Sequence, residues 1–82
     1  MKRVKIKTLK QQIKDNPIFD KRFKDGLFVS NFFKKKGTAI WLGDTNDEQI
    51  EELRKMGYII PRLLVGDEHL FYIFIYEPGD DK

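Results

Sequence analysis

The chain has 82 residues, a formal net charge of +3 and no cysteine. This length indicates one domain over residues 1–82, and the lack of cysteine excludes disulfides, thiol catalysis and cysteine-based metal sites. No apolar run is long enough to cross a bilayer, and no apolar signal segment follows the basic N-terminus, so we expect a cytoplasmic protein.

The charges are divided unevenly along the chain. Residues 1–36 hold twelve Lys or Arg and three Asp, whereas residues 37–82 hold four Lys or Arg and ten Asp or Glu. A division of this kind predicts either two faces of opposite sign or extensive pairing of charges within the fold.

The first elements predicted in chain order are a strand and a short helix. Residues 3–7 alternate cations with apolar side chains, which is the period of a half-buried strand. Thr8 and Gln11 then have the spacing of a capping box. The helix that they begin is expected to end before Pro17, because proline cannot continue it.

The next segment predicts a β-hairpin. The dipeptide Asp25-Gly26 favours a type I′ turn, which needs positive φ at both central residues. The apolar residues on either side of it predict strands at about 18–24 and 27–33. A helix over residues 30–36 is the competing interpretation of the second strand.

The middle of the chain predicts a strand and the clearest helix. Residues 38–42 are short and rich in residues that favour strands. The segment 45–56 then reads as a helix. Thr45 and Glu48 form its predicted capping box, and Gly57 is the expected terminating residue.

The last third predicts a second hairpin, with strands at 58–65 and 69–76, a turn between them and a flexible tail at about 78–82. The second strand is apolar on both faces, which places it in the middle of a sheet or in a homodimer interface. The predicted order is β-α-β-β-β-α-β-β. This is an α+β domain with two short helices and a small, mostly antiparallel sheet of about five strands.

The sequence offers little for catalysis. Ser30 and His69 are the single serine and the single histidine, and nothing places them together as a nucleophile and its base. Asp67 and Glu68 adjoin His69, but neighbouring residues on a turn point in different directions and do not form a metal site. The glycines lack phosphate-binding spacing. We therefore expect a protein that is not an enzyme, with no catalytic residue, metal or cofactor.

Two surfaces are candidates for binding. A basic surface would contact the phosphates of a polyanion such as a nucleic acid, and aromatic side chains would stack on its bases. The cations of residues 2–7 belong to this surface, and its named candidates are Lys21, Arg22, Lys24, Lys34, Lys35, Lys36, Phe32 and Trp41.

The second surface is acidic and would bind a protein. Its candidates lie on the predicted helix 45–56: Asp47, Glu48, Glu51 and Glu52. The exposed face of strand 69–76 offers another protein-binding surface. A small anionic ligand held among the lysines is a further alternative to a macromolecular partner.

The opening VKIKTLKQQIKDNP, a short basic strand running into a small helix, resembles the start of many small accessory proteins of phages and prophages of Gram-positive bacteria. The lysine-rich and isoleucine-rich composition is similar too. This resemblance covers the first 15–35 residues and assigns no functional residue. It implies a non-enzymatic accessory or inhibitor protein, for example an anti-defence inhibitor. Such a protein would bind a nucleic acid or a host protein, in the host cytoplasm if it is phage-encoded.

Overall fold

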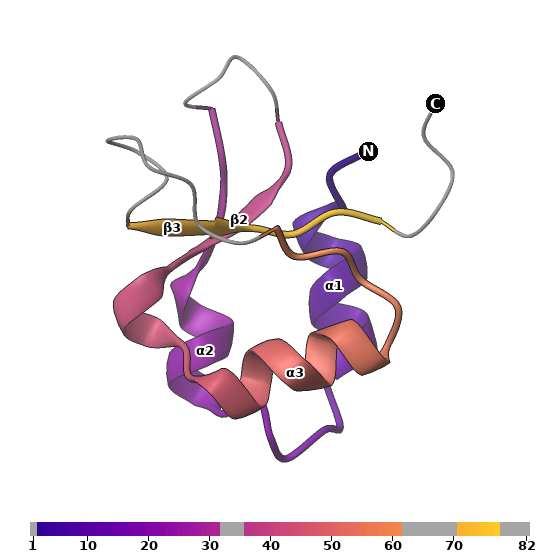
Figure 1. Cartoon of the computed structure of the whole chain (residues 1–82), viewed down its shortest axis with the longest axis vertical. Helices are drawn as coiled ribbons and strands as arrows, with labels where there is room; N and C mark the ends of the chain where they lie inside the picture. The colour runs from indigo at the N-terminus through magenta and orange to yellow at the C-terminus, as the bar shows by residue number, and fades with distance from the viewer. Residues whose placement is uncertain (1, 32–35, 62–70, 78–82) are drawn as a thin grey trace.

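The computed structural model describes residues 2–31, 36–61 and 71–77. In these ranges a three-stranded sheet lies against three helices, all on the same side of it (Figure 1). None of the described helices is long and apolar enough to span a membrane. The helices are α1 (Ile6–Ile13), α2 (Lys21–Gly26) and α3 (Asp47–Lys55), the strands are β1 (Leu27–Val29), β2 (Thr38–Trp41) and β3 (Tyr72–Phe74), and a 3₁₀ turn follows β2 at Leu42–Asp44.

The sheet has the order β1-β2-β3, and both strand pairs are antiparallel. Leu27, Ile40 and Ile73 lie opposite one another across the three strands and belong to the core. Because the strands alternate in direction, the end of β1, the start of β2 and the end of β3 meet at one end of the sheet.

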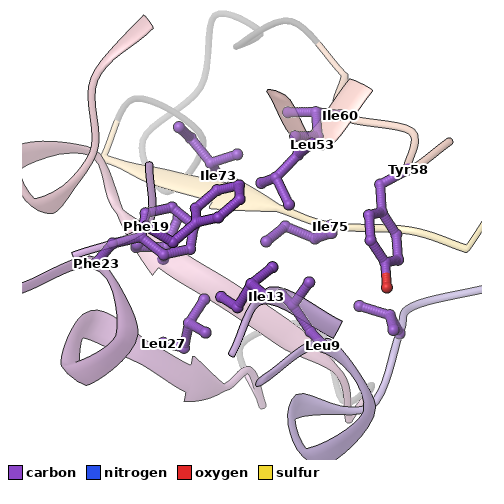
Figure 2. Close-up of a cluster of buried hydrophobic side chains, with 12 residues drawn as sticks. Leu9, Ile13, Phe19, Phe23, Leu27, Leu53, Tyr58, Ile60, Ile73 and Ile75 are labelled. Carbon is purple, nitrogen blue, oxygen red and sulfur yellow. The ribbon is translucent and has the colours of Figure 1, made fainter. Parts of the chain in front are cut away.

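The core fills the space between the sheet and the helices. Figure 2 shows side chains from all three helices, from β1 and β3, and from the segments between them converging on one cluster. Leu9 and Ile13 lie four residues apart on α1 and are fully buried, as are Phe23 of α2 and Leu53 of α3. The i,i+4 pattern of α1 therefore marks its inward face correctly.

The prediction of about five strands is wrong, because the described residues form three strands. The expected strand at residues 3–7 is reduced to one isolated bridge between Arg3 and Tyr76, and α1 already begins at Ile6. Of the expected strand at 58–65 the structure describes residues 58–61, which contribute one bridge between Ile59 and Tyr76. An isolated bridge pairs one residue with one other and does not make a strand.

The predicted strand at 18–24 and its turn are also wrong, because the chain forms α2 there. Asp20 caps this helix and accepts a hydrogen bond of 2.9 Å from the Phe23 amide. Asp25 lies four residues after Lys21 and forms an ion pair with it at 2.5 Å. Gly26 is the last residue of the helix, whereas a type I′ turn would require positive φ there.

The aromatic spacing of this segment fits a helix and a strand alike. Phe19 and Phe23 are separated by four residues, their ring centroids lie 4.8 Å apart, and both side chains are buried. In a strand, residues four apart also share a face, so this spacing alone did not distinguish the two structures. The cap at Asp20 and the ion pair at i,i+4 are the features that favour the helix.

The cap of α1 differs from the predicted capping box. Its N-cap is Lys5, which makes no side-chain capping bond, and Thr8 lies inside the helix. Because α1 has no side-chain cap, its stability depends on the burial of Leu9 and Ile13.

The helix at 45–56 is confirmed as α3, with a shifted cap. Asn46 and Gln49 form the capping box, one residue after the predicted pair. Gly57 ends the helix with φ of 104°, and its amide donates to the Arg54 carbonyl at 3.0 Å. The Tyr58 amide donates to the Leu53 carbonyl at 3.1 Å, which completes a Schellman motif.

The strand predicted at 38–42 is confirmed as β2, and the one at 27–33 is shorter than predicted and ends at Val29. In the last predicted strand, Ile73, Phe74 and Ile75 are all buried within the single chain. Phe71 of the same predicted strand is instead 49% exposed. The homodimer through this strand stays a prediction. The competing helix at 30–36, the turn of the last hairpin and the tail at 78–82 fall wholly or largely outside the described residues.

Removal of the α2 cap tests the assignment of this segment as a helix. We expect Asp20→Ala to lower the free energy of unfolding by about 1 kcal/mol, because the Phe23 amide loses its acceptor. Urea denaturation followed by circular dichroism measures the change. The matched control is Asp15→Ala, an exposed residue before the helix, which we expect to change stability by less than about 0.5 kcal/mol. Equal effects of the two substitutions would contradict the capped helix.

Candidate anion-binding site

A hollow of about 700 Å³ opens at the end of the sheet where Val29, Gly37 and Tyr76 meet. We call it the basic hollow, because four cations line it around a largely apolar interior. Its described lining residues are Lys2, Arg3, Lys5, Ile6, Val29, Lys36, Gly37 and Tyr76. The antiparallel sheet thus collects residues from both ends of the described chain at one site.

The backbone around Arg3 is fixed by hydrogen bonds on both sides. The Val4 amide donates to the Ile75 carbonyl at 3.2 Å, and the Glu77 amide donates to the Lys2 carbonyl at 2.7 Å. The Val4 carbonyl accepts from both the amide and the hydroxyl of Thr38, at 3.1 and 2.9 Å. Arg3 is therefore held between the start of β2 and the segment after β3.

The Arg3 side chain lies across Gly37 and over two aromatic rings. A methyl group built on Gly37 would come within 2.2 Å of the Arg3 Cβ atom, so only glycine leaves room for this side chain. The guanidinium carbon lies 4.1 Å from the ring centroid of Phe74 and 5.7 Å from that of Tyr76. Both distances are within the range of cation–π attraction.

The Arg3 guanidinium lacks an anionic partner among the described residues. Its Nε and Nη1 atoms are buried, and neither has a hydrogen-bond acceptor. A buried N–H group without an acceptor is costly, and more so when it carries charge. The aromatic rings offset part of this cost. An anion in the hollow that Arg3 lines would lower it further.

A row of lysines leads away from the hollow along α1. Ile6 lines the hollow, and Lys10 and Lys14 follow it at intervals of one helical turn. Lys24 of α2 reaches this row, because its ammonium group donates to the Lys14 carbonyl at 3.1 Å. We call Lys10, Lys14 and Lys24 the lysine row. We call the hollow and the lysine row together the basic surface.

The three predicted basic residues of α2 are all engaged within the fold. Lys21 pairs with Asp25, and this hydrogen bond is the main cause of a lowered pKa for the Asp25 carboxyl and a raised pKa for Lys21. The charge of Lys10 adds to the shift at Asp25, which places the lysine row close to this pair. Arg22 donates to the Gly43 carbonyl at 2.8 Å and to Asp44 at 3.1 Å, so it fastens α2 to the 3₁₀ turn.

The other predicted basic and aromatic residues are separated from one another. Lys36 is exposed and lines the hollow beside Arg3. Trp41 lies at the opposite end of the sheet, where its ring stacks on Phe71 at 5.6 Å. Four residues, or ~13 Å of strand, separate its β3 partner Tyr72 from Tyr76. The predicted residues Phe32, Lys34 and Lys35 lie outside the described residues.

The acidic candidates all lie on α3, in the lower part of Figure 1. Asp47 and Glu48 are exposed in its first turn, where the helix dipole favours negative charge. Glu51 pairs with Arg54 at 2.9 Å, and Glu52 accepts a hydrogen bond from the side-chain Nδ2 of Asn16 at 3.1 Å. Two of the four carboxylates therefore already have partners within the fold.

The described residues contain no cluster of three or more His, Cys, Asp or Glu side chains that could hold a metal ion. Ser30 is fully buried, and its amide donates to the Gly37 carbonyl at 2.7 Å. It therefore supports the strand end next to the hollow. His69 lies outside the described residues.

Sequence reasoning recognised the cations of residues 2–7 but treated them as one face of a strand. The structure instead brings Lys2, Arg3 and Lys5 together with Lys36, more than thirty residues later in the chain. The available signal was the glycine at position 37, next to three consecutive lysines. A glycine there allows another chain segment to approach closely, but it does not reveal which segment.

Comparison with known protein families, with curated proteins and with solved structures finds no match to this chain. Its function therefore has to be argued from the site.

Because Arg3 lies so close to Gly37, replacing Gly37 by alanine should lower stability more than replacing Gly43 does. We expect Gly37→Ala to lower the free energy of unfolding by about 1–3 kcal/mol, because the Arg3 stem or the backbone must move. In the control, Gly43→Ala, the new methyl group would meet only the indole edge of the exposed Trp41. We expect this variant to stay within about 0.5 kcal/mol of the parent. Urea denaturation measures both, and equal stability of the two variants would contradict the packing of Arg3 on Gly37.

Proposed function

We propose that this protein is a non-enzymatic binding module that holds a nucleic-acid strand along its basic surface. The observation that carries the proposal is the Arg3 guanidinium, which is packed on Phe74 and lines the basic hollow without an anionic partner among the described residues. Lys2, Lys5 and Lys36 surround the same hollow. Phosphate groups would supply the missing counter-charge.

The lysine row supports a repeating anion over a single charged group. From Lys5 at the start of α1 to Lys14 at its end the helix rises ~13 Å, and cations recur over this length. A nucleic-acid backbone carries a charge on every nucleotide, so the phosphates of one strand can contact the cations of the hollow and of the lysine row together. A small anion would occupy the hollow alone.

The biological role that we propose is that of a phage-type accessory or inhibitor protein, for example an inhibitor of a defence system of the host. The resemblance of the N-terminal segment and the lysine-rich composition support this role. Stoichiometric association through a basic surface, without chemistry, is compatible with it. The runner-up is a protein-binding module that uses the exposed carboxylates of α3, Asp47 and Glu48.

Salt dependence of binding tests the nucleic-acid proposal. Fluorescence anisotropy of a labelled 20-nucleotide strand should show affinity that falls steeply between low and physiological salt, because bound phosphates release counterions. We expect Lys36→Gln, at the hollow, to weaken binding and to reduce the slope of log K against log salt by about 0.7.

The matched control is Lys55→Gln, which removes one exposed lysine from α3, an element that contributes nothing to the described lining of the hollow. We expect this variant to bind as the parent does. Equal losses for Lys36→Gln and Lys55→Gln would show that net charge alone attracts the strand. Absence of binding at low salt would overturn the proposal and turn attention to a protein partner for α3.

A further inference from the structure

We infer that the basic hollow accepts one unpaired nucleobase beside a bound phosphate, so that the protein prefers single-stranded nucleic acid to a duplex. This inference rests on the proposed function and adds what the hollow itself recognises. Its basis is the combination of an apolar interior with a cationic rim at one site.

The apolar part of the hollow comes from Ile6, Val29 and Tyr76. Val29 is 45% exposed although it lies at the end of a strand next to the core. A flat, weakly polar group that enters the hollow would cover this apolar surface, and removing apolar surface from water is favourable. The Tyr76 ring supplies an aromatic surface for stacking, which every base can use regardless of sequence.

The size of the hollow fits a group larger than a phosphate. Its volume of about 700 Å³ is within the range of sites that hold small organic ligands, ~300–1,000 Å³. Lysine side chains could bind a phosphate on any convex surface. A concave site with an apolar interior instead favours a ligand that has both an anionic and an apolar part, as a nucleotide does.

The bases of a duplex are not free to enter. Their faces are stacked and their edges are paired, and removing one from the stack costs a few kcal/mol. A single strand has unstacked bases at little cost, and its backbone can continue from Arg3 towards Lys10 and Lys14. The same protein surface therefore gains more from a single strand than from a duplex.

An acidic peptide with an apolar side chain is the competing occupant. It could place a carboxylate near Arg3 and an apolar group against Val29. It would also have to present further carboxylates at regular intervals to satisfy the lysine row. A nucleic-acid strand has this regular charge in any sequence, and for that reason we favour it.

The first experiment compares three probes at an equal concentration of phosphate groups and equal salt: a 12-nucleotide single strand, the same strand as a duplex, and inorganic polyphosphate. We expect the single strand to bind at least tenfold more tightly than the duplex, which corresponds to ~1.4 kcal/mol. A 2-aminopurine base within the strand reports stacking, and we expect its fluorescence to decrease on binding.

The second experiment changes the aromatic ring of the hollow. We expect Tyr76→Leu to reduce affinity for the single strand about tenfold. Affinity for polyphosphate should fall much less, because Phe74, the nearer of the two rings, still lies under Arg3. Tyr76→Phe keeps the ring and should bind as the parent does. The control is Phe71→Leu, a 49% exposed ring at the opposite end of the sheet, which we expect to have no effect. Thermal unfolding by circular dichroism checks that each variant is folded.

The outcomes separate this inference from the proposed function. Equal salt-dependent binding of single strand, duplex and polyphosphate would retain the basic surface as a phosphate site and overturn the base-binding hollow. Unchanged single-strand binding by a folded Tyr76→Leu variant would overturn it as well. Binding of an acidic peptide without any binding of nucleic acid would overturn both proposals.

Discussion

The peptide groups of Val4 hold together the part of the structure on which the fold and the basic hollow depend. The Val4 carbonyl accepts two hydrogen bonds from Thr38, and its amide donates to the Ile75 carbonyl. Val4 and Thr38 are almost completely buried, so these bonds are shielded from water. In a buried position the loss of a hydrogen-bond partner is most costly. The start of the chain is thereby tied to the start of β2 and to the end of β3. This contact and the burial of Leu9 and Ile13 in the core together position α1 against the sheet.

The same contact explains how the hollow obtains its charge. Once Val4 is fixed, Arg3 must lie across Gly37 and over Phe74, and Lys2 and Lys5 must lie beside it. The fold accepts a poorly satisfied guanidinium at this point, although most cations on α2 have partners within the chain. A group that the fold leaves unsatisfied while satisfying its neighbours is a reasonable place to look for a ligand. The contrast between Arg3 and Arg22 is the electrostatic basis of the proposed function.

The charge division seen in the sequence has two different structural outcomes. A small part of it is internal pairing, since Arg22 of the basic half forms an ion pair with Asp44 of the acidic half. Most of the rest is a separation of surfaces among the described residues, with the basic hollow and the lysine row on one set of elements and the exposed carboxylates on α3.

The sequence by itself determined the elements whose signals are local. The apolar period of α1, the strand β2 and the helix α3 with its terminal Gly57 follow from spacing and from the φ that only glycine readily adopts. The helix at 21–26 also has local signals, the Asp20 cap and the Lys21–Asp25 ion pair, but the aromatic spacing before it suits a strand and a helix equally. Tertiary structure decided which cations meet. Lys36 and Arg3 become neighbours because Val4 is hydrogen-bonded to Thr38 at the start of β2. No local pattern in the sequence predicts a contact between residues so far apart in the chain.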